Sequence, residues 1–178
     1  MNRRSPVVVP GRRLHYLPML MSIPNLQLAH RRDAAAIASM SRRFIESGLE
    51  PSWTTERVER AILHADSTVL TARTGRELVG FAIMQFGDST AHLNLLAVAT
   101  GLRRAGIGRS LMTWLEDSAR VAGTFMIRLE CRQSNQGAVR FYRAVGYRET
   151  GVIPRYYQGR EDAVRMERDL RAAHLASD

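Results

Sequence analysis

An apolar strand, a glycine-containing turn and a helix follow one another near the middle of the chain, and this order constrains the fold more than any other feature. Residues Leu93–Val98 are nearly all apolar, as in a buried strand. The turn is Arg103-x-x-Gly106-x-Gly108, and apolar residues with helical spacing follow from Ile107 to Ala119. Glycines let a ligand approach the backbone, and a helix N-terminus offers unpaired N–H groups. We therefore expect an anion-binding turn suited to a diphosphate.

Other phosphate-binding motifs fit this turn less well. A dinucleotide fingerprint needs a third glycine where Leu111 stands, and a P-loop needs a lysine, which the chain lacks. The remaining alternative is an ordinary helix start with solvated arginines. The strand before the turn and the segments after it favour the ligand-binding interpretation.

Strand and helix patterns alternate along the chain and predict one α/β domain with a mixed sheet of six or seven strands. The predicted strands cover 26–30, 69–72, 77–86, 91–98, 126–131, 147–152 and 162–168. The predicted helices cover 33–46, 54–64, 106–122 and 135–145. Asp33 is a candidate N-cap for the first helix, and either Thr54 or Thr55 for the second. Residues 1–24 contain four prolines and predict a flexible basic extension, in which Met21 is an alternative start; 25–171 form the domain and 172–178 a tail.

The composition excludes several classes of protein. No apolar run is long enough to span a bilayer, and the N-terminus lacks a signal-peptide pattern. The single cysteine, Cys131, has no cysteine or histidine neighbours with zinc-binding spacing, so we expect no metal. We expect a cytoplasmic protein with no membrane partner.

All 26 basic residues are arginine and the net charge is +9. Codon bias explains such an excess, and so does a basic face that attracts anionic ligands; the sequence leaves both open. No RNA-recognition motif accompanies the arginines, so we expect no specific nucleic-acid partner.

The chain resembles the GNAT acetyltransferases over roughly 26–170, and within them the N-terminal acetyltransferases, which include the bacterial ribosomal-protein-alanine enzyme. Five segments carry the resemblance: Leu95–Val98, Arg104–Arg109, Leu129–Asn135, Phe141–Tyr147, and Tyr156-Tyr157 with Gly159–Ala163. The resemblance implies about four helices around the sheet, a V-shaped splay between the fourth and fifth strands, and acetyl-CoA as donor.

The resemblance also assigns the catalytic residues, Glu130 as base and Tyr142 as acid. An acid in the middle of an apolar strand needs a partner or a function, and the alternative for Glu130 is an ion pair with Arg128 or Arg132. The alternative for Tyr142 is a core aromatic, although the neighbouring Phe141 is the more expected core residue. Cys131 falls on the strand face opposite Glu130, so we expect a small buried side chain there and not an acyl-enzyme.

Cofactor contacts are implied at the end of the fourth strand, in the turn and on the last helix. They are Leu96, Ala97, Val98, Arg103, Arg104, Ala105, Gly106, Ile107, Gly108, Arg109, Ser110, Asn135 and Tyr142. Asn135 is also a good N-cap residue, which explains it without a ligand.

The implied acceptor contacts are Trp53, Tyr156 and Tyr157; a hairpin tip packed on Trp53 is the alternative for the two tyrosines. We expect N-acetylation by direct attack, with a protein or peptide N-terminal α-amine as the preferred acceptor. A small amine (an antibiotic, polyamine or amino-acid derivative) is the alternative acceptor, and a non-catalytic CoA-binding module is the alternative function. Both a monomer and a homodimer fit the sequence.

Overall fold

The computed structural model describes residues 24–171, so the expected extension (apart from Pro24) and the tail at 172–178 lie outside the described residues. Within them the chain forms one seven-stranded mixed sheet with four α-helices. The strands are β1 Asn25–Leu28, β2 Ser67–Thr74, β3 Glu77–Phe86, β4 Thr90–Val98, β5 Met126–Arg132, β6 Arg148–Tyr157 and β7 Glu161–Asp169. The helices are α1 Ala34–Phe44, α2 Thr55–Leu63, α3 Ile107–Val121 and α4 Gln136–Ala144, with 3-10 turns η1 Arg31–Asp33 and η2 Thr100–Leu102.

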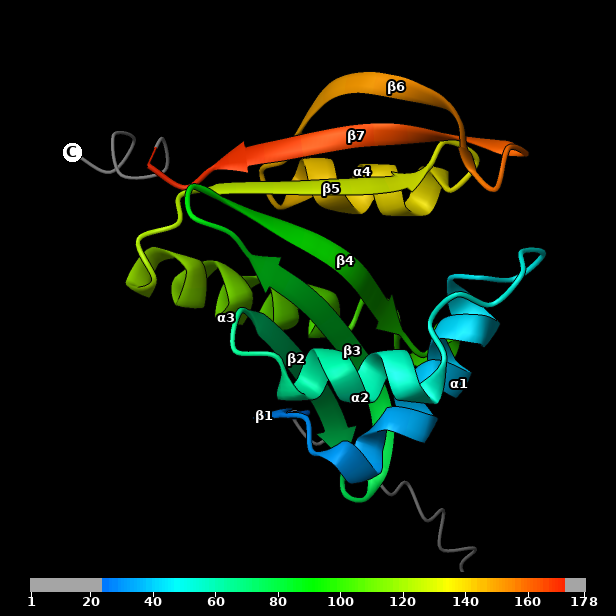
Figure 1. Cartoon of the computed structure of the whole chain (residues 1–178), viewed down its shortest axis with the longest axis vertical. Coiled ribbons are helices and arrows are strands. Elements are labelled where there is room, and N and C mark those ends of the chain that lie inside the picture. The colour runs from blue at the N-terminus through cyan, green and yellow to red at the C-terminus, as the bar shows by residue number, and fades with distance from the viewer. Residues whose placement is uncertain (1–23, 172–178) are drawn as a thin grey trace, which may run out of the picture.

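The sheet separates two helical layers (Figure 1). Its strand order is β1-β2-β3-β4-β5-β7-β6, and only β4 and β5 run parallel, because α3 connects them as a crossover. Helices α1 and α2 cover one face, where Ile37 and Val58 pack on Phe81. Helices α3 and α4 cover the other, where Leu111 and Leu115 are fully buried. A side chain on one face therefore reaches the other only where the sheet opens.

The sheet opens between β4 and β5. Their parallel pairing runs from Thr90–Leu93 opposite Met126–Leu129 and then stops. Beyond that point β5 continues to pair with β7 as far as Arg132, whereas β4 diverges from β5 (Figure 1). The predicted V-shaped splay is therefore confirmed, and the β5-facing backbone edge at the end of β4 has no strand partner.

A bulge in β4 lies at the start of this splay. Ile83 of β3 pairs with Leu95 and Met84 pairs with Leu93, so Asn94 is the extra residue. Bulges bend a strand and redirect its side chains. Here Leu93 belongs to the core under α3, whereas Leu95 belongs to the core under α1 and α2.

Two sequence predictions need correction. Strand β6 continues to Tyr157, five residues beyond the predicted end, because it is an exposed edge strand whose apolar alternation is weak and which tolerates Pro154. Helix α1 begins directly after Asp33, but the carboxylate does not cap it. It accepts a hydrogen bond from the His30 backbone N–H at 2.8 Å and pairs with Arg73 at 2.6 Å. Among the described residues, no helix is both long and apolar enough to cross a membrane.

Candidate active site

The predicted anion-binding turn is an exposed loop at the N-terminus of α3. Gly106 is the N-cap and has φ +83°, a conformation that favours glycine, and Arg104 also has a positive φ of 68°. The side chains of Arg103, Arg104 and Arg109 are exposed, whereas Ile107 is buried and anchors the helix start. The first N–H groups of α3 have no partner within the helix. Backbone donors and exposed arginines thus occur in one short segment, and Arg109 Nη2 also donates to the Ala144 carbonyl at 3.4 Å.

Gly108 lies against α4. A Cβ atom built on Gly108 would come within 3.2 Å of the Phe141 ring, so a larger residue would displace that ring. Phe141 in turn contacts Tyr142 edge-to-face, with 5.2 Å between ring centroids. The turn is therefore linked to Tyr142 through the ring of Phe141.

Tyr142 is the buried aromatic of α4, with 7% exposure, and Phe141 is only half-buried. This reverses the prediction that Phe141 is the core residue. The reason is the helix face: Tyr142 follows Val139 by three residues and shares its core under the sheet. Burial, and then the nearby Cys131 and Tyr157, raise the pKa of Tyr142 far above its ordinary value, so its phenol keeps its proton at neutral pH.

Glu130 occupies the opposite face of the sheet. Its neighbours Leu129 and Cys131 belong to the core under α3 and α4, so Glu130 faces the α1–α2 layer. One carboxylate oxygen lies 2.6 Å from His92 Nε2, and the other accepts from Arg165 Nε at 3.0 Å. The expected alternative partners, Arg128 and Arg132, bind Glu167 and Glu161 instead.

His92 and Glu130 change each other's ionisation. The hydrogen bond from His92, more than the opposing effect of burial, lowers the pKa of Glu130, and Arg165 lowers it further. The hydrogen bond to Glu130 raises the pKa of His92, against burial and with support from Asn94. His92 Nδ1 lies 3.1 Å from Asn94 Oδ1, an atom that only accepts, so Nδ1 carries a hydrogen. A single proton therefore lies between Nε2 and the carboxylate in the paired state.

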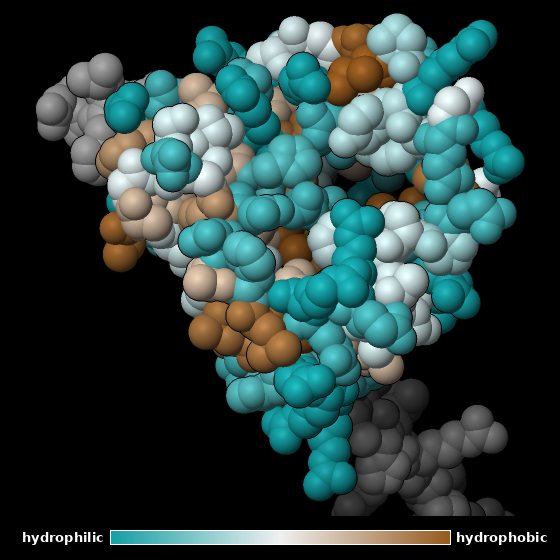
Figure 2. All heavy atoms as spheres, in the orientation of Figure 1, coloured by the Kyte–Doolittle hydropathy of each residue, from teal (hydrophilic) through white to brown (hydrophobic). Residues whose placement is uncertain are grey.

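Two segments border this face at the open end of the V, the loop between α1 and α2 and the β6–β7 hairpin (Figure 1). The side chain of Gln158 in the hairpin joins them: it donates to the Glu50 carbonyl at 2.8 Å and accepts from the Glu50 N–H at 3.0 Å. In the space-filling view, a hollow remains where Figure 1 has the gap between β4 and β5 (Figure 2).

The buried carboxylate of Glu46 shapes the loop. It accepts hydrogen bonds from the Ser52 N–H at 2.6 Å, the Ser52 hydroxyl at 2.8 Å and the Trp53 N–H at 3.1 Å. Burial alone would raise the pKa of Glu46, but these bonds and one from Ser41 outweigh it and lower the pKa. The loop conformation that presents Trp53 is thus held by one ionised side chain.

The two predicted acceptor tyrosines lie at the tip of the β6–β7 hairpin. Tyr157 is half-buried and donates to the Glu130 carbonyl at 3.1 Å, and Tyr156 is 46% exposed. The aromatic rings of the pair meet edge-to-face at 5.0 Å. Trp53 stacks with Arg57, at 4.2 Å from the guanidinium carbon to the ring centroid. The structure thus brings the Tyr157 hydroxyl to the backbone carbonyl of Glu130, and it places Trp53 on the face of the sheet that carries the Glu130 side chain.

Comparison with known proteins identifies the family. The family model "Acetyltransferase (GNAT) family" matches residues 35–147, more than half of the chain. The chain belongs to the GNAT acetyltransferase family. The predicted family is confirmed, and it is a family of acyltransferases, as the predicted enzyme class requires; the seven-stranded sheet with its splay is the GNAT fold.

Three relatives illustrate the similarity of this GNAT chain. N-alpha-acetyltransferase RimI of Mycobacterium tuberculosis is 31% identical over 144 residues, which are 78% of this chain and 88% of that protein. The crystal structure of the ribosomal-protein-S18-alanine N-acetyltransferase from Escherichia coli has a TM-score of 0.72 and 25% identity, covering 83% of this chain and 94% of that one. The structure of yncA from Salmonella typhimurium with its cofactor acetyl-CoA has a TM-score of 0.69 and 22% identity, covering 84% of this chain and 95% of that one.

Several other curated relatives are matched over a smaller part, since the chain spans 38% to 63% of their length. Membership of the GNAT acetyltransferase family agrees with the predicted donor, acetyl-CoA, which the yncA structure contains. The residues fit this cofactor: the unpaired edge of β4 includes Leu96, Ala97 and Val98, and the turn with Ala105, Ile107 and Ser110 follows it. Ser110 itself donates to the Gly106 carbonyl at 3.3 Å.

Two residues of the GNAT domain have roles that the sequence left open. Asn135 Oδ1 accepts from the Ala138 N–H at 3.0 Å, so it is the N-cap of α4. Cys131 is buried, and burial raises the pKa of its thiol to about 11, with smaller contributions from Glu149 and Glu130. A thiol with that pKa is a poor nucleophile, as expected from its strand face.

Sequence reasoning missed His92, Asn94 and Arg165. Each is polar within a strand, and the signal was present in β4, where His92 and Asn94 interrupt an otherwise apolar alternation. Their partners come from other strands, β5 and β7, so only the sheet register brings the four side chains together.

Proposed function

We propose that this protein is an acetyl-CoA-dependent N-acetyltransferase whose acceptor is the α-amine of a peptide or protein N-terminus. One observation supports the reaction above all. Glu130 and Tyr142 lie on opposite faces of the sheet, and the gap between β4 and β5 is the place where groups on the two faces can approach one another. An acceptor approaching from the α1–α2 side and a donor lying in the gap would place the reacting atoms between them.

The proposed cofactor site consists of the arginine-bearing turn, the free edge of β4 and the start of α4. Acetyl-CoA, when bound, supplies a thioester whose carbonyl carbon is open to attack by an amine. The backbone N–H groups at Leu96–Val98 and at the N-terminus of α3 would bind its amides and its diphosphate. Asn135 uses only Oδ1 for its cap, which leaves its amide N–H₂ group to bind the cofactor.

Glu130 and His92 together are the proposed base. While the proton lies between Nε2 and the carboxylate, the pair is weakly basic. Above the raised pKa of His92 the pair has lost this proton, and the free Nε2 behind the carboxylate can take up the proton of the amine. An α-amine has a pKa of about 7.7–8, so a modest base suffices. Glu130 would thus accept the proton of the attacking amine, directly or through water, and share it with His92.

Tyr142 is the proposed group that faces the departing sulfur. Its pKa lies well above the value of about 8.5 for an ordinary thiol, so complete transfer of its proton to a thiolate is uphill. Tyr142 would therefore act mainly by donating a hydrogen bond that stabilises negative charge on sulfur.

The bridge between Gln158 and Glu50 favours a chain end as acceptor. This bridge connects the loop between α1 and α2 to the β6–β7 hairpin. A peptide that passed beneath it toward Glu130 would have to enter with one of its ends first. The relatives named for alanine and α-amine acetylation support the same acceptor.

The test is the release of CoA thiol from acetyl-CoA in the presence of N-terminal peptides or small amines. Saturable turnover with a peptide beginning in alanine or serine, and none with its N-terminally blocked form, is the expected result. Turnover restricted to small amines would reject the peptide acceptor. CoA binding without turnover on any acceptor would reject catalysis.

A further inference from the structure

A pocket of about 300 Å³ lies between α2 and the sheet, on the face that holds Glu130. Its lining is Trp53, Arg57, Arg60, Ala61, His64, Ser67, Ile83, Gln85 and Asn94. Asn94 is also the bulged residue that bonds to His92, whose other ring nitrogen reaches Glu130. One wall of the pocket is thus two hydrogen bonds from the proposed base.

The pocket is positively charged. Its lining contains two arginines and no carboxylate. Within the described part of the chain, neither Arg57 nor Arg60 forms an ion pair within 4.0 Å. The nearby Glu59 is bound to Arg31 at 3.0 Å, and Glu46 is committed to the loop before α2. Glu56, one helical turn before Arg60, accepts from Thr54, and the charge of Arg60 makes only a smaller contribution to its lowered pKa. The two guanidinium groups therefore remain available for an external anion.

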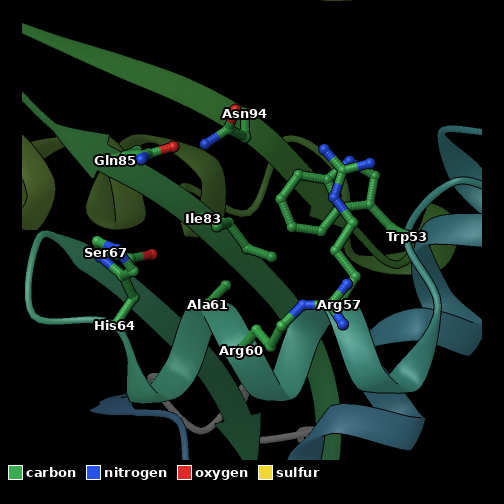
Figure 3. A pocket seen from close by; sticks show the side chains of 9 residues that line it. All are labelled: Trp53, Arg57, Arg60, Ala61, His64, Ser67, Ile83, Gln85 and Asn94. Atoms are coloured by element: carbon green, nitrogen blue, oxygen red, sulfur yellow. The ribbon is translucent and has the colours of Figure 1, made fainter.

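Arg57 is held in position before any ligand arrives. Its guanidinium stacks on Trp53, and Nη1 donates to the Ser52 carbonyl at 3.2 Å. A guanidinium has five N–H donors, so most of them remain free. Arg60 follows one helical turn later. In Figure 3 the Arg57 side chain rises from α2 to Trp53, and the Arg60 side chain runs along α2 in the direction of Arg57. Stacking reduces the entropy that Arg57 would lose on binding, which favours recognition of a carboxylate.

We propose that Arg57 and Arg60 bind an acidic side chain of the acceptor, at the position that follows its N-terminal residue. The inference rests on the proposed function and adds a substrate preference to it. A peptide whose α-amine lies at Glu130 would have its next side chain within reach of the pocket, because Asn94 in the pocket wall is connected to Glu130 through His92. A carboxylate there meets two cations in a partly enclosed space, whereas a basic side chain is repelled.

The experiment compares two peptides that start with alanine and differ only in glutamate or glutamine at the second position. For the wild-type protein at low salt, we expect kcat/KM to be at least about tenfold higher for the glutamate peptide. The ratio should fall to near one in the Arg57→Gln/Arg60→Gln double variant. In Arg60→Glu, a third peptide with lysine at the second position should be acetylated with a higher kcat/KM than the glutamate peptide.

Arg43→Gln is the matched control. Arg43 is exposed and stacks on Phe44 at 5.1 Å, so the variant also removes one aromatic-stacked charge, but outside the pocket. Arg43→Gln should keep the wild-type ratio of kcat/KM between the glutamate and glutamine peptides. This result would show that the preference comes from the pocket and not from the overall positive charge of the protein.

The outcomes distinguish the two proposals. If wild type acetylates both peptides equally well, the acidic preference is wrong and the peptide acceptor stands. If the preference persists in a folded double variant, its source is not Arg57 and Arg60, and the inference is also wrong. If no peptide is acetylated while a small amine is, the proposed function itself fails. Thermal unfolding of each variant confirms that it is folded, and the wild-type peptide comparison needs no variant.

Discussion

Replacing Glu130 with glutamine keeps the size of the side chain and removes its charge. The variant loses two charge-assisted hydrogen bonds, to His92 at 2.6 Å and to Arg165 at 3.0 Å. The Glu130 side chain is 7% exposed, but those of His92 and Arg165 are 40% and 47% exposed. Solvent screens both pairs, so each contributes about 1 kcal/mol, and the free energy of unfolding should fall by about 2 kcal/mol.

A loss of this size leaves the protein folded. Domains have unfolding free energies of about 5–15 kcal/mol, so about 99% of the variant or more remains native, with Tm lower by roughly 4–8 °C. Turnover should fall much further, by about 100-fold or more, because a positioned base contributes 10²–10⁴-fold. Unfolding therefore cannot account for the expected loss of activity.

The assay is CoA thiol release at saturating acetyl-CoA and peptide, with calorimetry on the same samples. Glu167→Gln is the control, because Glu167 pairs with Arg128 at 2.8 Å on the same two strands. Both variants should lose stability, but only the Glu130 variant should lose turnover. Turnover of Glu130→Gln within threefold of wild type would refute the proposed base.

The pH dependence gives a second readout of the same variant. Glu130 has a pKa below its ordinary 4.5, so its contribution to stability is present above 4.5 and is lost as the pH falls through the lowered value. His92 has a pKa above 6.5, so its contribution is full below 6.5 and is lost as the pH rises through the raised value. The difference in unfolding free energy between wild type and Glu130→Gln should thus be largest between about pH 4.5 and 6.5. The acid limb of the pH profile of kcat should move to lower pH in Glu130→Gln, because the hydrogen bond to the Glu130 carboxylate is the main cause of the raised His92 pKa. An acid limb at the wild-type pH would argue against His92 as the group that receives the proton of the amine.

Three further predictions concern the other parts of the site. Tyr142→Phe should lower turnover by about 10–100-fold and change the affinity for acetyl-CoA by no more than about twofold. Tyr147→Phe is the control, because it removes a buried hydroxyl from the neighbouring ring, whose centroid lies 5.8 Å from that of Tyr142, and it should leave turnover unchanged. Equal losses of turnover in both variants would contradict the role of Tyr142. Gly106→Ala forces an alanine to φ +83° at a strain of about 1 kcal/mol and should raise KM for acetyl-CoA several-fold. Gly101→Ala in the same loop is the control, because a Cβ atom there meets nothing within 4 Å, and its KM for acetyl-CoA should stay at the wild-type value. Initial rates at varied acetyl-CoA concentration measure both KM values. Glu46→Gln should raise KM for the peptide and leave KM for acetyl-CoA unchanged, because the carboxylate holds the loop at Trp53; a matching rise in the KM for acetyl-CoA would show a general loss of structure instead.

The sequence predicted what depends on local patterns. Helical spacing from Ile107 to Ala119 and the glycines of the turn specify α3 and its N-terminus without any tertiary partner. Strand β3 was predicted with its observed bounds, because its apolar residues are bounded by turn residues on both sides. The edge strand β6 was predicted short, because a strand exposed along most of its length has little apolar signal.

Tertiary structure alone decided how the polar side chains are combined. The sequence singled out Glu130 but suggested Arg128 or Arg132 as partners, since these are its neighbours along the strand. The partners are Arg165, which lies directly opposite Glu130 in β7, and His92, which lies opposite Arg128, two residues before Glu130. They are 35 and 38 positions away in the chain. Sheet register is a long-range property, and no local pattern encodes it.

The arginines show the same division. The sequence establishes a net charge of +9 and an excess of arginine, but it does not locate a charged surface. The packing of α2 on the sheet places Arg57 and Arg60 in one pocket beside Trp53, because residues three apart share a helix face. The turn at Gly106 and Gly108 thus pointed to the donor from sequence alone. The groups proposed to bind the acceptor could be identified only from the tertiary structure, because they come from strands and helices that are far apart in the sequence.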